Sequence, residues 1–151
     1  MERTLVLLKP DSVQRGLIGA ILFRLEARGL KIIALRMLQM DLLLANRHYE
    51  AHVGKPFFPG LVDFITSGPL VAAVLEGRNA VEVVRQTMGP TDSAKAPPGT
   101  VRGDLALDIG RNLIHGSDSP EAAEREIPIF FEGGDVFSYK RATDPWITEG
   151  A

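Results

Sequence analysis

The chain has 151 residues, a net charge of −2 and a mean hydropathy of +0.05. This length suits one domain with a buried core, and the nearly neutral charge argues against nucleic-acid binding driven by phosphate neutralisation. The chain has no cysteine, which excludes disulfides, thiolate nucleophiles and cysteine-based zinc sites. Because the longest apolar runs, Leu5–Leu8 and Leu70–Leu75, are too short to span a bilayer, no membrane segment is expected.

Short apolar strands are expected to alternate with helices along the chain. The apolar runs that predict strands cover residues 4–8, 31–40, 69–75 and 112–115. The segments with helical spacing cover residues 11–29, 41–52, 57–67, 78–88 and a last helix from residue 120. Asp11 or Ser12 is expected to cap the first helix, Asp41 the second, and Ser117 or Ser119 the last, because short polar side chains accept from the free N–H groups of a first turn.

Without its insertions this order is βαββαβ, the ferredoxin-like pattern. The chain is therefore predicted to be a single α+β domain with a four-stranded antiparallel sheet covered by helices. Residues 89–104 hold three prolines and three glycines and are expected to form a long loop, which in a compact domain is usually functional. The ferredoxin-like fold hosts many activities, so the activity has to be argued from a site.

Two of the three histidines lie close together in the sequence. His48 and His52 are four residues apart on a predicted helix, a spacing that can offer two metal ligands. No third ligand is evident beside them. The alternative, a solvated helix face without a metal, is the expectation for both side chains.

His115 stands in a different setting, at the end of a predicted strand and before Gly116, which is expected to leave room beside the ring. A histidine in such a place is often a structural residue. It is also a candidate nucleophile, because neutral imidazole can attack at physiological pH without activation. Ser117 and Glu126 are the nearest candidates to hold its second nitrogen.

Glycine-rich phosphate loops are absent, so a phosphate site in this chain has to use side chains. Arg85 and Arg102 offer guanidinium donors suited to phosphate oxygens, and Lys9 closes a buried strand. Each of these cations alone is equally compatible with a surface ion pair. Phe57 lies in a proline-flanked aromatic pair that either belongs to the core or stacks on a nucleobase.

Taken together, several segments resemble nucleoside diphosphate kinases in order and spacing. They are Lys9-Pro10-Asp11, His48-Tyr49, Lys55-Pro56-Phe57-Phe58, Thr66-Ser67-Gly68-Pro69, Pro98–Asp104 and Asn112–Asp118. The Asn-x-x-His-Gly-Ser-Asp segment is the most specific of these. The resemblance extends from Arg3 to about Phe131, and it singles out His115 as the catalytic histidine.

The resemblance implies a ping-pong reaction in which a nucleoside triphosphate, usually ATP, phosphorylates His115 and a nucleoside diphosphate then takes the phosphoryl group. It implies that Lys9 contacts the phosphate and ribose, that Tyr49 lies beside the histidine, and that Ser117 and Glu126 orient the imidazole. The residues implied to bind nucleotide are Lys9, Phe57, Leu61, Arg85, Thr91, Arg102, Ile109 and Asn112. Mg²⁺ is implied as cofactor, held mainly by nucleotide phosphates with no direct protein ligand.

The sequence departs from the family pattern at Ser12, Leu105 and Pro128. Pro128 is expected to kink the last helix or to end it near Ile127, because proline lacks an N–H and restricts the residue before it.

The tail, residues 132–151, resembles longer family tails that reach a neighbouring subunit. The resemblance, which rests on Asp144–Glu149, implies a homo-oligomer, a hexamer or alternatively a tetramer. A cytoplasmic location is also expected, with which the absence of cysteine is compatible. The rival hypotheses are a single-stranded RNA-binding sheet and a scaffold that has lost catalysis. An RNA-binding sheet would show basic and aromatic residues on adjacent strand positions, whereas these strands are apolar.

Overall fold

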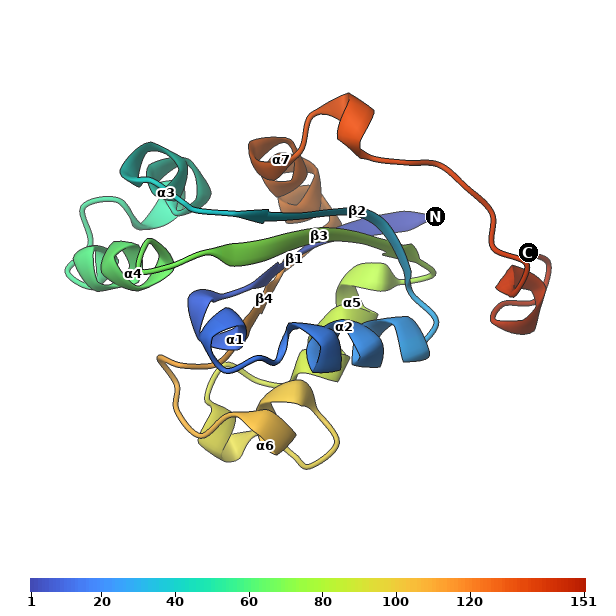
Figure 1. The fold of residues 1–151 in the computed structure, drawn as a ribbon, viewed down its shortest axis with the longest axis horizontal. Helices are drawn as coiled ribbons and strands as arrows, with labels where there is room; N and C mark the ends of the chain where they lie inside the picture. The colour runs from blue at the N-terminus through green and yellow to red at the C-terminus, as the bar shows by residue number, and fades with distance from the viewer.

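The computed structural model describes all 151 residues and contains one four-stranded sheet. Its strands are β1 (Glu2–Leu8), β2 (Lys31–Leu38), β3 (Leu70–Gly77) and β4 (Ile114–Gly116). Their order in the sheet is β2-β3-β1-β4, and each neighbouring pair is antiparallel (Figure 1). The predicted ferredoxin-like α+β arrangement is confirmed.

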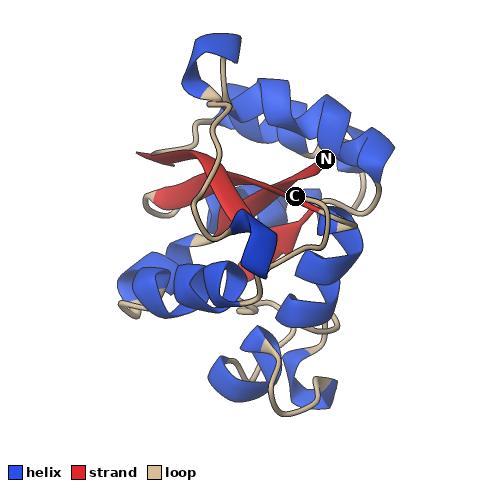
Figure 2. Ribbon diagram, turned by 90° about the vertical axis from the view of Figure 1, so that its right-hand side faces the viewer, coloured by secondary structure: helices blue, strands red, loops and turns tan.

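Helices cover both faces of this sheet (Figure 2). They are α1 (Pro10–Gln14), α2 (Ile18–Ala27), α3 (Leu42–His48), α4 (Phe58–Ile65), α5 (Ala80–Met88), α6 (Val101–Leu105) and α7 (Pro120–Phe130). Short 3₁₀ turns occupy Glu50–His52, Ser93–Lys95, Gly133–Asp135 and Asp144–Trp146. None of the helices has the length and apolar content needed to cross a membrane.

The central strand β1 is buried on both faces, and its side chains alternate between two cores. Leu5 and Leu7 pack in the core beneath α3, α4 and α7, whereas Val6 and Leu8 pack in the core beneath α2 and α5. This alternation follows from the two-residue period of a strand. It explains why the β1 sequence is a continuous apolar run, and it holds the end of β1, where Lys9 follows, firmly within the domain.

The first predicted helix is two helices, and its predicted caps were wrong. α1 begins at Pro10, with Lys9 as the cap residue and no side-chain cap, and it ends at Gln14. Proline suits a first helical position because it has no N–H to satisfy there. Gly16, at a φ of 67°, then separates α1 from α2. Asp11 and Ser12 lie inside α1, and their side chains bond to the distant backbone of Leu113 instead.

The loop predicted over residues 89–104 is partly helical, since α6 begins at Val101. The hydroxyl of Thr100 caps α6 by accepting from the N–H of Gly103 at 2.9 Å. A Cβ on Gly103 would lie 2.0 Å from the carbonyl oxygen of Pro97, so this close turn requires glycine.

α7 begins as predicted, with the hydroxyl of Ser119 accepting from the N–H of Ala122 at 3.0 Å. The predicted end near Ile127 was wrong, because α7 continues to Phe130 and the N–H of Phe131 still donates to the Ile127 carbonyl at 3.0 Å. Pro128 removes only the donor to the carbonyl four residues earlier, and both residues lie on the exposed face of the helix.

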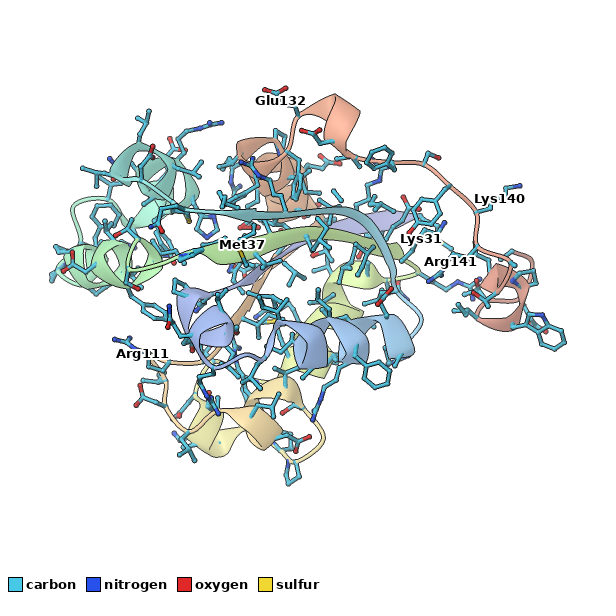
Figure 3. The ribbon with its side chains drawn as sticks, in the orientation of Figure 1. Lys31, Met37, Arg111, Glu132, Lys140 and Arg141 are labelled. Carbon is cyan, nitrogen blue, oxygen red and sulfur yellow. The ribbon has the colours of Figure 1, made fainter.

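The tail after Phe131 packs against its own domain, beside the edge of β2 that has no strand partner. The N–H of Phe137 donates to the carbonyl of Ile33 at 2.8 Å, and Arg141 donates to the carbonyls of Gly29 and Leu30 (Figure 3). Trp146, near the end of this tail, is 91% exposed. The tail thus leaves its largest apolar side chain without a partner in its own chain.

Candidate active site

The end of β1 places Lys9 beside the segment that leads into β4. The Nζ of Lys9 donates to Oδ1 of Asn112 at 2.7 Å, and Nδ2 of Asn112 donates to the carbonyl of Thr91 at 3.1 Å. Burial and the nearby charge of Arg102 lower the pKa of Lys9 to about 8. The structure thus brings together four residues that the sequence assigned to nucleotide binding.

Arg102, on α6, is buried and braces the floor of this site. Its three nitrogens donate to the carbonyls of Gly89, Asn112 and Ile114 at 2.9, 3.1 and 2.5 Å. Burial, and then the charge of Arg85, lower the pKa of Arg102 to about 10, so the guanidinium stays charged at neutral pH. Arg102 therefore fixes the backbone around the site as well as supplying charge.

Leu113 has the most constrained backbone of the site, with a φ of 72°. A bulky residue rarely adopts this left-handed conformation, which is costly unless its surroundings enforce it. The carboxylate of Asp11 accepts from the N–H of Leu113 at 3.1 Å. The hydroxyl of Ser12 and the N–H of Lys9 donate to the Leu113 carbonyl at 2.6 and 2.8 Å. Asp11 and Ser12 are thus site residues that sequence reasoning missed and took for helix caps.

His115, on β4, faces the carboxylate of Glu126 on α7. Its Nε2 lies 3.0 Å from Oε2 of Glu126. Burial tends to raise the pKa of Glu126, but the hydrogen bond and charge of His115, together with the hydroxyl of Ser117, hold it below its usual value. The ionised carboxylate accepts a hydrogen bond from Nε2–H, which assigns the ring proton to Nε2 and leaves the lone pair on Nδ1.

Ser117 reaches Glu126 from a fixed position at the end of β4. Its Oγ accepts from the N–H of Leu5 at 3.2 Å, and its own N–H donates to the Leu5 carbonyl at 3.1 Å. Both Ser117 and Leu5 are fully buried. The hydroxyl is therefore anchored to the central strand while it stabilises the charge of Glu126.

His48 does not occupy a solvated helix face, and that prediction was wrong. Its side chain is only 2% exposed, and its ring centroid lies 4.9 Å from that of His115. Burial and the nearby His115 lower the pKa of His48 to about 3, so this ring is neutral. Tyr49 packs against it at 4.6 Å, and burial raises the pKa of the Tyr49 hydroxyl to about 12.

Phe57 lies at the open end of the site, just before α4, and is 52% exposed. Its ring centroid is 5.3 Å from that of His52. Leu61 follows one turn later and is half-buried, and Ile109 stands on the loop before β4 with 58% exposure. Arg111 joins this loop to α4, because its guanidinium lies 4.2 Å from the ring centroid of Phe64 (Figure 3).

Arg85 lies at the solvent-facing rim near β4. Its Nη1 donates to Oδ1 of Asp118 at 3.0 Å, and its side chain remains 43% exposed. Thr91, likewise exposed, follows α5 by three residues. Arg85 and Thr91 are thus placed where an incoming charged ligand can reach them.

Gly116 allows α5 to pack closely against β4. It was predicted to leave room beside the His115 ring. A Cβ at this position would lie 3.0 Å from side-chain atoms of both Val84 and Met88 on α5. The close approach of α5 to β4 therefore requires a glycine next to the histidine, for a different reason from the one predicted.

The site thus has a cationic end, where Lys9 and Arg102 are largely buried and Arg85 lies at the rim, and an exposed aromatic end. The cationic end suits polyphosphate, because Lys9, Arg85 and Arg102 offer charged donors. The aromatic end offers flat apolar surface of the kind that stacks on a nucleobase. His115, whose ring is partly exposed and contacts Glu126 through Nε2, offers an imidazole that can accept a phosphoryl group on Nδ1.

Comparisons with known proteins agree with this geometry. A family model described as nucleoside diphosphate kinase matches residues 2–136. The chain is 58% identical over 147 residues to a nucleoside diphosphate kinase of Thermomicrobium roseum, covering 97% of this chain and 99% of that protein. It is 54% identical to that of Archaeoglobus fulgidus, covering 99% of each chain.

A solved structure shows the same fold. The nucleoside diphosphate kinase of Halobacterium salinarum in complex with CDP matches with a TM-score of 0.95 and 52% identity, over 98% of this chain and 99% of that one. The chain therefore belongs to the nucleoside diphosphate kinase family, enzymes that transfer the terminal phosphate of a nucleoside triphosphate to a nucleoside diphosphate.

Proposed function

We propose that this chain carries the transferred phosphoryl group on Nδ1 of His115. The observation that supports this assignment is the contact between Nε2 and the buried carboxylate of Glu126 at 3.0 Å. Because Glu126 accepts a hydrogen bond from Nε2–H, the ring proton stays on Nε2 and the lone pair of Nδ1 is free to attack. Glu126 and Ser117 then act together to hold the tautomer and the orientation of the ring.

In the first half-reaction, Nδ1 bonds to the γ-phosphorus while the bond from that phosphorus to the bridging oxygen breaks. The nucleoside diphosphate leaves with the bonding electrons. A second nucleoside diphosphate attacks the phosphohistidine in the reverse sense, and one site serves both halves because the two nucleotides are chemically alike. Lys9, Arg85 and Arg102 supply positive charge where the phosphate oxygens gather charge, the main catalytic contribution in such transfers.

The remaining residues are assigned to substrate positioning. Phe57 stacks on the base between Leu61 and Ile109, and stacking tolerates every base because each has a π-face. Thr91 binds phosphate, Asn112 binds the sugar hydroxyl, and Tyr49 packs beside the histidine. Since Lys9 and Thr91 already orient the amide of Asn112, its remaining polar capacity can be directed to the ribose.

Enzymes of this family use a divalent cation with the nucleotide, and we assign Mg²⁺ to this role. Mg²⁺ prefers oxygen ligands and keeps several waters. The structure groups three metal-binding side chains in one place, but two of them are imidazoles, which suit Mg²⁺ poorly. The cation is therefore assigned to the nucleotide phosphates, where it neutralises charge, with no direct ligand from the protein.

We propose that the protein is a homohexamer. We also propose that it is located in the cytoplasm, where nucleoside triphosphates are available. Support for assembly comes from apolar side chains left exposed: Leu35 and Met37 on the edge strand β2 are 53% and 56% exposed, and Trp146 in the tail is 91% exposed. We assign Trp146 to a neighbouring subunit. Sedimentation equilibrium measures the mass directly, and a tetramer or a monomer would contradict the assignment.

Labelling with ATP carrying radioactive γ-phosphate tests the proposed function. We expect an acid-labile, base-stable label on the purified protein, and release of that label to a nucleoside diphosphate. His115→Gln should lose the label and exchange phosphate at least about a thousandfold more slowly, whereas the matched variant His52→Gln should retain the label. Lack of label on the folded wild-type protein would favour the inactive scaffold, and salt-sensitive binding of single-stranded RNA would favour the binding module.

A further inference from the structure

Three metal-binding atoms converge behind the catalytic histidine, on the side away from Nδ1. They are Nδ1 of His48, Nε2 of His115 and a carboxylate oxygen of Glu126, and all lie within 4.8 Å of one another. Oε2 of Glu126 is 3.0 Å from the His115 nitrogen and 4.0 Å from the His48 nitrogen. The cluster draws on α3, β4 and α7, so only the fold brings it together.

His48 packs against the rings of Tyr49, His115 and Phe130, but its Nδ1 has no polar partner. Its side chain is almost completely buried, and its Nδ1 makes no hydrogen bond, although it points towards Glu126. Buried polar atoms are nearly always paired, so the unpaired Nδ1 of His48, 4.0 Å from the Glu126 carboxylate, points to a ligand that the two groups would share.

The donor set fits a borderline cation such as Zn²⁺. Two imidazole nitrogens and one carboxylate are a recurrent zinc set, which keeps a fourth position for water. Zinc bonds of about 2.0–2.1 Å in tetrahedral geometry place ligand atoms roughly 3.3 Å apart. The separations of 3.0 and 4.0 Å from Glu126 lie close to this value, and the two imidazole nitrogens, within 4.8 Å of each other, would move closer together on binding the metal.

We propose that His48, His115 and Glu126 form an inhibitory site for Zn²⁺ that is distinct from the nucleotide-bound cation. Metal on Nε2 of His115 takes the lone pair of that nitrogen. The neutral ring then carries its single proton on Nδ1, which moves there from Nε2, and no proton leaves the ring. Nδ1 thereby loses the lone pair needed to attack phosphorus, an effect that rests on the proposed role of His115.

Binding is measured first without nucleotide, because nucleotide phosphates also bind Zn²⁺. Titration of the full chain with Zn²⁺ in a calorimeter should give one site per chain. Co²⁺ in place of Zn²⁺ should produce visible absorption typical of tetrahedral nitrogen and oxygen ligands. Neither measurement depends on activity, so both test the site even if the proposed role of His115 fails.

His48→Gln is the informative variant, since it keeps the length and polarity of the side chain but removes the imidazole. It should weaken Zn²⁺ binding at least about tenfold and abolish the Co²⁺ absorption. His52→Gln is the matched control, because His52 lies one turn away and outside the cluster; it should leave both signals unchanged. Equal binding by both variants, or no stoichiometric binding to the wild-type chain, would overturn the site.

Inhibition is then measured as label incorporation from ATP with Mg²⁺ in excess and free Zn²⁺ held by a metal buffer. Each variant is compared with its own rate without Zn²⁺, and a chelator should restore that rate. The Zn²⁺ concentration for half inhibition should rise at least about tenfold in His48→Gln and stay constant in His52→Gln. Zn²⁺ that binds at the cluster without slowing phosphorylation would overturn the inhibitory role.

Discussion

The two ends of the proposed active site, its phosphate end and its base end, are built in opposite ways. At the phosphate end, Leu113 bonds to Asp11, 102 residues away in the chain, and Arg102 is buried with three carbonyl partners. At the base end, Phe57 is half exposed, and its carbonyl accepts from Leu61 within the same turn. Long-range, buried bonds fix the first end, and local structure with open apolar surface forms the second.

The difference matches what each end has to do. Phosphoryl transfer depends on positioning and on charge already in place, so small displacements of the cations or of His115 slow the reaction. The base lies far from the reacting atoms, and stacking accepts many orientations and every base. Substitutions at the phosphate end should therefore slow the chemical step, and substitutions at the base end should weaken binding.

Arg102→Lys, at the phosphate end, should have a larger effect on the reaction than any substitution at the base end. Lysine keeps the charge but cannot reach three carbonyls, so the floor of the site loosens and the charge moves. We expect phosphorylation of His115 at saturating ATP to slow about a hundredfold in single-turnover experiments. Arg3→Lys, at an exposed ion pair, is the control. A change in ATP affinity alone would contradict the assignment of Arg102 to the chemical step.

Phe57→Ala should weaken nucleotide binding by about 1–3 kcal/mol, the usual scale of a base–aromatic contact, which is roughly 5- to 150-fold in affinity. The saturated rate of His115 phosphorylation should change much less, because the base contact is the same throughout transfer. Phe57→Tyr keeps the stacking surface and should restore affinity. If instead Phe57→Ala slowed the saturated step, the division between the two ends would be wrong.

The pH dependence of kcat/KM tests the charge at the phosphate end in the unsubstituted protein. Because the pKa of Lys9 is lowered to about 8, the lysine is charged below this pH and loses its charge above it. The ratio kcat/KM, which reports ionisations of the free enzyme, should fall about tenfold per pH unit above 8. Lys9→Arg should remove this alkaline fall when its kcat/KM is plotted relative to the variant's own maximum, since arginine stays protonated. A fall that persists in Lys9→Arg would assign it to another group.

Ser12→Ala should have the smallest effect of these substitutions. It compares the two ends through the free energy of unfolding. The buried hydroxyl donates to the carbonyl of the strained Leu113, and its loss should lower the free energy of unfolding by about 1 kcal/mol. Ser67→Ala removes a similar bond to the Phe64 carbonyl beside the base end, where the serine is exposed. Its effect should stay within about 0.5 kcal/mol. Denaturant unfolding of both variants measures the difference, and equal losses would contradict the comparison.

The sequence by itself determined the elements of the fold. Apolar runs indicated the strands, because β1 and β3 are buried on both faces and each position along them needs an apolar side chain. Helical spacing and the capping residues Asp41 and Ser119 located two helix starts, since these signals act within one turn. The family motifs, which are also local, are the basis for proposing His115, Lys9 and Arg102 as site residues.

Only the tertiary structure decided how these pieces meet. In the structure, Asp11 and Ser12 bond to Leu113 and do not cap a helix as expected. His48 packs against the ring of His115, although it was expected on a solvated helix face. The tertiary structure also placed Glu126, which precedes Pro128 in an uninterrupted α7, within reach of His115. Such contacts join residues far apart in the chain, so no local pattern encodes them. They follow from the packing of strands and helices, which sets which polar atoms find a partner and which remain alone.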